Sequence, residues 1–106
     1  MKSIYKYGLD IPERGNNKKF FTRLLPKYSQ VLHIGADSRT GQPVMWVMID
    51  TGYRSEERTF CVAGTGAEIP TDKMFEHLGT TPIVMGNIVD IDEICIWHYF
   101  EVTGGF

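Results

Sequence analysis

The segment from Pro43 to Gly66, PVMWVMIDTGYRSEERTFCVAGTG, carries the strongest indication of the fold. Its first part, Val44 to Ile49, is apolar at every position. A strand with one wet face needs apolar residues only at alternate positions, so this uninterrupted run predicts a central strand that is buried on both faces. A second strand is predicted from Arg58 to Ala63. The polar residues between the two predict an exposed loop, which carries Glu56 and Glu57.

Working outward, four further segments have the composition of strands, namely Ser3–Leu9, Phe20–Leu25, Gln30–Ala36 and Ile94–Val102. They are rich in β-branched and aromatic residues, and turn-forming residues separate them. For Phe20–Leu25 a helix is the alternative, but the following Pro26 favours an extended chain. Within Gln30–Ala36, strict alternation places Leu32 and Ile34 on one face, and Val31 and His33 on the other. The glycine-containing segment Asp37–Pro43 then predicts a hairpin connection.

Three segments are less regular. Thr71–Leu78 fits either a helix, capped by Thr71 and closed by Gly79, or a weaker strand that continues through Thr81. The residues from Pro82 to Glu93 predict an irregular loop with an acidic end, and residues 103–106 predict a loose tail. Taken together, the chain predicts one β domain over residues 1–106, with six to seven short strands and at most one short helix. Its architecture is expected to be an antiparallel sandwich or a partly open barrel.

The composition limits the function classes. The chain has 106 residues, 42 % of them hydrophobic, and a formal charge of −2. This charge supplies no general attraction for nucleic acids or anionic membranes, and no apolar run is long enough to cross a bilayer. The first residues do not resemble a signal peptide, so we expect a cytoplasmic protein with Cys61 and Cys95 as buried free thiols.

No catalytic or metal-binding motif is found in the sequence. His33, His77 and His98 lack the spacing of metal-ligand pairs, and Ser38 and Ser55 lack a neighbouring base. Gly64-Thr65-Gly66 could present backbone N–H groups to an anion, but the lysine of a P-loop is missing. We therefore expect no enzymatic activity, no cofactor and no metal. The acidic residues near the end of the loop lack the pattern of a calcium loop and instead suit pairing with basic residues of a protein partner; they are Asp90, Asp92 and Glu93.

Several motifs together resemble a known family. They are the strand I-Y-K-Y, the strand V-M-W-V-M-I-D, the segment R-T-F-C-V-A-G-T-G, the sequence H-L-G-T and the closing I-W-H-Y-F-E-V. This combination is similar to a family of small domains of unknown function found mainly in bacteriophages and prophages. The resemblance spans Ile4 to Val102 and implies that Phe75–Thr81 is a strand. It implies a phage origin and expression in the host cytoplasm, and it assigns no activity.

The main functional hypothesis is therefore a small, non-enzymatic phage accessory protein that binds and inhibits a bacterial host protein. An anti-defence role, such as an anti-CRISPR, is its most specific form. The expected contact residues are Asp90, Asp92, Glu93, Glu56 and Glu57. An exposed edge strand could also support a homodimer.

Two alternatives belong to other classes. In the first, the protein sequesters a nucleotide signal: aromatic residues stack on a base and the glycine-rich turn meets a phosphate. The residues expected for that site are Trp46, Trp97, Tyr99, Gly64, Thr65 and Gly66. In the second alternative, the protein is a structural component of the phage.

Overall fold

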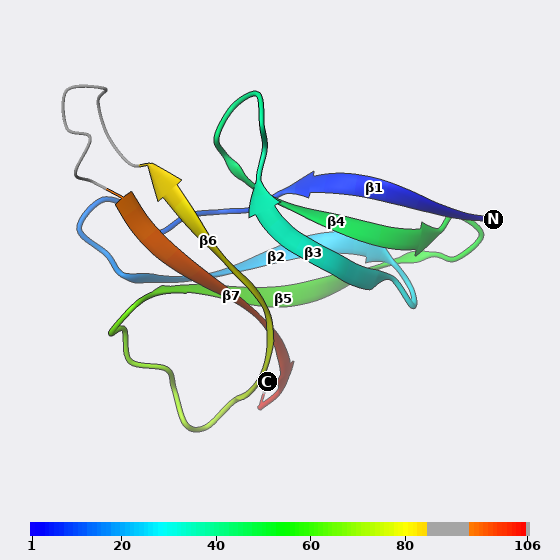
Figure 1. Cartoon of the computed structure of the whole chain (residues 1–106). Coiled ribbons are helices and arrows are strands. Elements are labelled where there is room, and N and C mark those ends of the chain that lie inside the picture. The colour runs from blue at the N-terminus through cyan, green and yellow to red at the C-terminus, as the bar shows by residue number, and fades with distance from the viewer. Residues whose placement is uncertain (85–93, 106) are drawn as a thin grey trace.

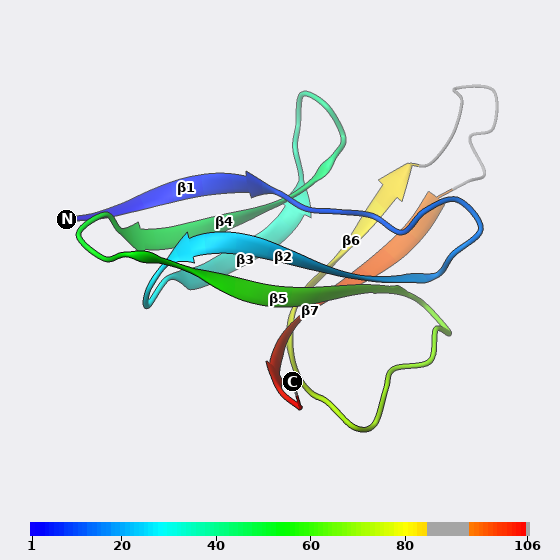
Figure 2. The same cartoon turned by 180° about the vertical axis from the view of Figure 1, so that it is seen from behind.

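The computed structural model describes residues 1–84 and 94–105, which form seven β-strands and no helix. The strands are β1 (Lys2–Gly8), β2 (Lys18–Pro26), β3 (Gln30–Ala36), β4 (Pro43–Asp50), β5 (Ser55–Gly64), β6 (Met74–Val84) and β7 (Ile94–Gly104). They form two antiparallel sheets, ordered β1-β4-β3 and β2-β5-β7-β6 (Figures 1 and 2). The predicted antiparallel β architecture is thus confirmed, and the sheets do not close into a barrel.

The apolar strand β4 lies at the centre of the three-stranded sheet, as predicted. Its inner face is fully buried and consists of Met45, Val47 and Ile49. Its outer face is only partly buried, because the other sheet covers the inner side alone. There the indole of Trp46 packs against the His33 ring, with 5.7 Å between ring centroids. The prediction that both faces of this strand are buried is therefore confirmed for the inner face and wrong for the outer face.

The segment Pro43–Gly66 crosses from one sheet to the other, since β4 and β5 belong to different sheets. The connection is shorter than the sequence suggests, because β5 begins at Ser55 and not at Arg58. Glu56 and Glu57 are consequently strand residues, paired with Leu25 and Leu24 of β2, and their prediction as loop residues was wrong. Both remain exposed, as expected.

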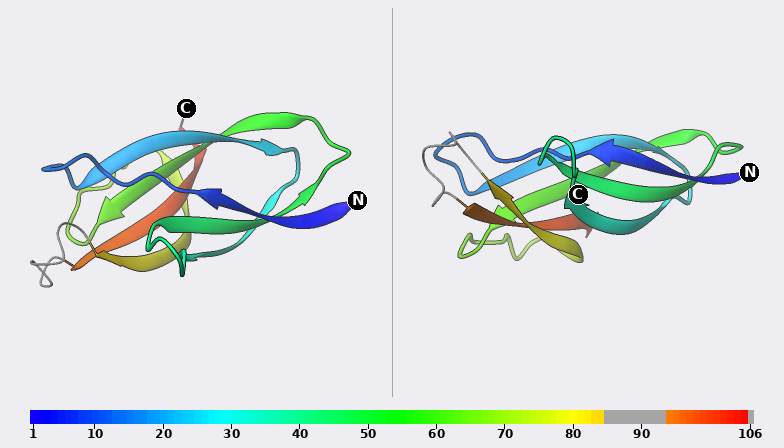
Figure 3. Two further views of the ribbon diagram at one scale, coloured as in Figure 1. Left: turned by 90° about the horizontal axis from the view of Figure 1, so that it is seen from above. Right: turned by 45° about the horizontal axis from the view of Figure 1, so that its top comes forward.

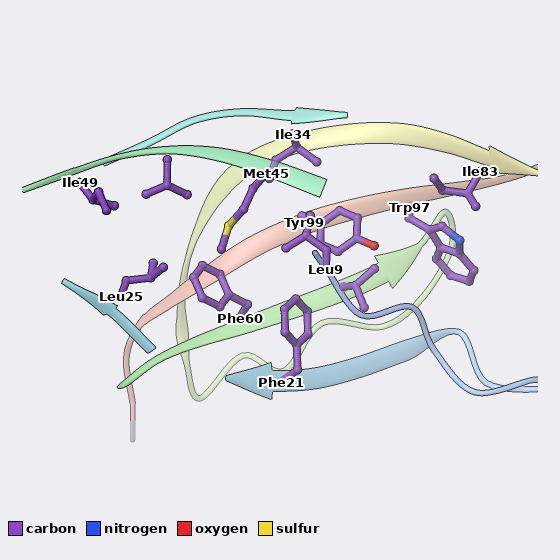
Figure 4. Close-up of a cluster of buried hydrophobic side chains, with 12 residues drawn as sticks. Leu9, Phe21, Leu25, Ile34, Met45, Ile49, Phe60, Ile83, Trp97 and Tyr99 are labelled. Carbon is purple, nitrogen blue, oxygen red and sulfur yellow. The ribbon is translucent and has the colours of Figure 1, made fainter. Parts of the chain in front are cut away.

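The core lies between the two sheets and is built mainly from β2, β4, β5 and β7 (Figure 4). Met45, Phe60 and Tyr99 are almost completely buried at its centre. Burial of one such side chain contributes about 1.5 to 3 kcal/mol. The Tyr99 hydroxyl donates a hydrogen bond of 2.8 Å to the backbone carbonyl of Asp10, which satisfies the one polar atom of this ring. Burial raises the pKa of the Tyr99 phenol.

Three register shifts interrupt the described strand pairings; one lies between Met74 and Phe75, and the other two change which residues of β3 and β6 share a face. In β3 the register shifts between Val31 and His33. Val31 therefore pairs with Val47 and joins Ile34 on the inner face, whereas strict alternation had separated the two. In β6 the register shifts between His77 and Gly79.

The remaining differences concern the end of the chain. The helix alternative for Thr71–Leu78 is wrong, and the strand over Phe75–Thr81 is confirmed as part of β6. This strand continues to Val84, so residues 82–84 do not belong to a loop. Likewise, Thr103 and Gly104 belong to β7 rather than to a loose tail. The acidic residues Asp90, Asp92 and Glu93 lie outside the described residues.

Candidate functional site

Four polar side chains gather on the outer face of the four-stranded sheet and form a cluster that we call the threonine–histidine cluster. It consists of Thr65, His77, Thr80 and His98. The His98 ring is central: its Nε2 lies 2.8 Å from Thr65 Oγ1 and its Nδ1 lies 2.9 Å from Thr80 Oγ1. The Thr80 hydroxyl also contacts His77 Nε2 at 3.0 Å. Three hydrogen bonds thus connect the end of β5 to β7 and β6.

The bulge in β6 makes this arrangement possible. In a regular strand, residues 77 and 80 would point to opposite faces. The bulge inserts one extra residue at Leu78, so that His77 pairs with Phe100 and Thr80 with His98. Both side chains consequently point to the same outer face. Bulges frequently redirect side chains in this way next to functional sites.

With neutral imidazoles, the three hydrogen bonds form a chain with one direction. A hydroxyl donates one proton, and a neutral imidazole has one donor and one acceptor nitrogen. Either each group donates toward His77, or each group donates toward Thr65. In the first case the Thr65 hydroxyl donates to His98, and in the second it accepts from His98. The second case leaves the Thr65 proton free to donate to another group.

A pocket of about 220 Å³ adjoins the cluster. Its wall is the chain from Ala63 to Ala67, which includes the Gly64-Thr65-Gly66 turn. Ile69, His98 and Phe100 complete it. The pocket therefore combines a small apolar surface with the polar atoms of Thr65 and His98. Such a combination is typical of small-molecule sites, although this pocket is smaller than the roughly 300 to 1,000 Å³ of drug-sized sites.

The residues of the predicted nucleotide site do not come together. Gly64, Thr65 and Gly66 line the pocket. Trp97 and Tyr99 are buried in the core, where neither ring is accessible for stacking. Trp46 lies on the outer face of the other sheet. Thr80, in contrast, was missed by the sequence analysis, and His77 was considered only as a metal ligand, because the shared orientation of the two side chains depends on the bulge.

A second surface feature is the edge strand β1. It pairs with β4 on one side, and six of its seven residues are exposed, which leaves Ile4 59 % and Tyr5 49 % accessible. Lysine in the middle of an edge strand normally discourages pairing with another chain. Here the Lys6 ammonium forms an ion pair with the Asp37 carboxylate. This ion pair, together with the backbone N–H groups of Arg39 and Thr40, lowers the pKa of Asp37 to about 2. The edge therefore has little free charge at its centre.

The acidic residues of β5 lie beside a shallow hollow of about 580 Å³. Glu56 and Glu57 line it, together with the ion pair of Arg58 and Glu101. Among the described residues, Glu56 and Glu57 have no ion-pair partner. Their role as contacts for a basic partner stays a prediction.

Within residues 1–84 and 94–105, no three His, Cys, Asp or Glu side chains are arranged to hold a metal ion. The same residues include no helix of the length and apolarity needed to span a bilayer.

These observations define the class: a two-sheet antiparallel β domain with a free edge strand on one sheet and a polar cluster beside a small pocket on the other. A family model described as "Domain of unknown function (DUF7352)" matches residues 1–105. The chain therefore belongs to this family. No curated protein and no solved structure matches it.

Proposed function

We propose that this protein is a non-enzymatic binding protein that adds an extended segment of a partner protein to the free edge of β1. On the resemblance to phage domains, the partner is a bacterial host protein that the phage protein inhibits in the host cytoplasm. Inhibition of a defence system, such as CRISPR, is the most specific form of this proposal.

One observation carries the proposal: β1 is exposed on both faces and is paired along one edge only, as far as the structure describes the chain (Figure 3). A partner strand at this edge would form backbone hydrogen bonds with β1, as in other cases of β-strand addition. Side chains would add specificity, because Ile4 is exposed on the outer face and Tyr5 on the opposite one, whereas Tyr7 is half-buried against the core. Exposed tyrosines are frequent anchors in protein interfaces.

The other edges are less available. β3 lies against β6, where Gly79 is in contact with Ile34. Arg23 of β2 donates to the carbonyl of Gly8, the last residue of β1, and pairs with Asp10. The end of β1 and the residues after it therefore cover part of the β2 edge, and the unpaired edge of β1 that remains open is Lys2–Tyr7. The β1 edge is therefore the surface that best fits a partner strand.

The experiment is affinity capture from bacterial lysate with the wild-type protein, an Ile4→Lys/Tyr5→Lys variant and a Leu24→Lys control. Leu24 is also an exposed apolar strand residue, with 66 % of its surface accessible, but it lies on the other sheet. We expect one bacterial protein to be retained by the wild type and the control and to be lost with the β1 variant. Equal retention by all three proteins, each shown by circular dichroism to be folded, would contradict the proposal.

A further inference from the structure

The pocket beside the threonine–histidine cluster is not used by the proposed partner binding, since it lies on the other sheet from β1. We propose that this pocket binds a small phosphate monoester with a flat apolar group. The phosphate is held at the Gly64-Thr65-Gly66 turn, and the flat group packs against Ile69 and Phe100. This inference does not depend on the proposed binding at β1.

The turn provides donors for a phosphate. Gly66 adopts a φ of +91°. The turn is closed by a hydrogen bond of 3.0 Å that the Ala67 N–H donates to the Gly64 carbonyl. Within the described part of the chain, no backbone carbonyl accepts from the N–H groups of Thr65 and Gly66. Successive free N–H groups in such a turn form a concave site for anions. A side chain built at Gly66 would meet no atom within 4 Å, so space is open there.

The cluster can supply a further donor without any change in net charge. When the chain of hydrogen bonds runs from His77 toward Thr65, the Thr65 hydroxyl accepts from His98 and is free to donate. A phosphate oxygen at the turn would favour this direction, because it accepts the Thr65 proton. His98, Thr80 and His77 then act as positioning residues that orient the Thr65 hydroxyl.

The electrostatic environment also favours an anion. Lys18 pairs with Ala63, a pocket residue, and its ammonium donates at 2.9 Å to the Glu68 carbonyl in the wide loop that follows β5 (Figure 2). This places one positive charge next to the turn. The exposed Glu68 side chain belongs to the same loop, and neither it nor Lys18 is among the residues that line the pocket.

The volume restricts the rest of the ligand. About 220 Å³, with walls of Ile69, Phe100 and two alanines, suits a single flat ring system. Aromatic rings such as Phe100 pack well against flat groups. A nucleoside monophosphate, with its base in the pocket, belongs to this chemical class.

The test uses phenyl phosphate as the probe, with adenosine monophosphate as a second one, and phenol and inorganic phosphate as comparators at equal ionic strength. Isothermal titration calorimetry and ¹H–¹⁵N NMR measure binding to the wild-type protein. We expect phenyl phosphate to bind more tightly than phenol or inorganic phosphate and to shift the amide signals of Thr65 and Gly66. Absence of binding by both phosphate monoesters at millimolar concentration would contradict the proposal.

Variants test the assigned roles. Thr65→Val keeps the shape of the side chain but removes the donor, so we expect at least about tenfold weaker binding of phenyl phosphate, since hydrogen bonds to charged groups are strong ones. His33→Gln is the matched control, because His33 packs on Trp46 in the other sheet, and it should leave binding unchanged. If Thr65→Val fails to fold, Lys18→Met replaces it and should weaken phenyl phosphate but not phenol. Unchanged affinity in a folded Thr65→Val protein would overturn the assigned donor role.

Discussion

The guanidinium of Arg58 and the carboxylate of Glu101 form a two-point ion pair between β5 and β7. The distances are 2.7 Å from Nε to Oε2 and 2.6 Å from Nη2 to Oε1, and the side chains are only 18 % and 14 % exposed. Arg58 also donates at 2.6 Å to the Ser29 carbonyl, which ties the turn before β3 to the same pair. Arg58 begins the segment R-T-F-C-V-A-G-T-G and Glu101 lies in the closing I-W-H-Y-F-E-V, so each of these segments contributes one residue with a structural role.

Removal of one partner of this pair should destabilise the fold. In Glu101→Gln, Arg58 would stay largely buried without its counter-charge, and we expect the free energy of unfolding to fall by about 2 to 3 kcal/mol. Urea denaturation measures this change. Glu57→Gln is the control, because Glu57 is exposed and has no ion pair among the described residues, and its effect should stay within about 0.5 kcal/mol. Equal effects of both variants would contradict a stabilising role for the pair.

The contact between β3 and β6 depends on the absence of a side chain at Gly79. A Cβ atom there would lie 2.6 Å from the Cβ of Ile34, which is too close for any two carbon atoms. We expect Gly79→Ala to lower the free energy of unfolding by about 1 to 3 kcal/mol through overpacking. Gly8→Ala is the control, since a Cβ at Gly8 meets nothing within 4 Å. In a double-mutant cycle, Ile34→Ala should relieve part of the cost, and strict additivity would argue against a direct clash.

The ion pair of Lys6 and Asp37 should make stability depend on pH in the acid range. The folded protein holds the pKa of Asp37 at about 2, below its ordinary value of 3.8, mainly through the hydrogen bond from Lys6. The lowered pKa means that this stabilisation is fully present above about pH 4 and is lost as the pH falls toward 2. Asp37→Asn keeps the acceptor for the Arg39 and Thr40 N–H groups but loses the ion pair. The stability difference between wild type and variant should therefore shrink between pH 4 and pH 2, and a constant difference would exclude this origin.

The exposed carboxylates of β5 should steer a basic partner rather than hold it. We expect Glu56→Lys/Glu57→Lys to weaken capture of the partner at low salt and to have little effect at high salt, because exposed charges are screened. Pull-down at two salt concentrations measures this. A loss of capture that is equally large at both concentrations would instead identify these residues as a main contact.

The two thiols should differ in reactivity. Cys61 is buried under the outer face of the four-stranded sheet, and burial raises the pKa of its thiol. Cys95 is half-buried and free. Because the thiolate is the reacting form, Ellman's reagent should modify Cys95 in the native protein much faster than Cys61. Cys95→Ser should then leave only slow labelling, and fast labelling of that variant would contradict the burial of Cys61.

The sequence predicted the strands well where a local pattern was strong. The apolar run Val44–Ile49 and the alternating segment Ile94–Val102 both form strands, since β-branched and aromatic residues favour a pleated, half-buried chain. The ends of elements were less predictable. Ser55–Glu57 and Pro82–Val84 have polar or proline-containing sequences, and they are extended because a neighbouring strand pairs with them.

The candidate site was predictable only in part. Gly64-Thr65-Gly66 was recognised as a turn with free donors, because glycines after an apolar run indicate a chain reversal. The sequence analysis considered His98 only as a metal ligand and did not predict its hydrogen bonds with Thr65 and Thr80. Nothing in the local sequence indicates that a bulge at Leu78 turns His77 and Thr80 to one face. Trp97 and Tyr99, both suitable for stacking by type, are core residues instead.

By itself, the sequence determined that this chain forms antiparallel β-strands around an apolar core, because the spacing of apolar residues and turn formers acts locally. Only the tertiary structure decided which strands share a sheet, that β1 keeps a free edge, and that Thr65, Thr80 and His98 meet. Those outcomes depend on strand register, and register is set by pairing between segments that are far apart along the chain.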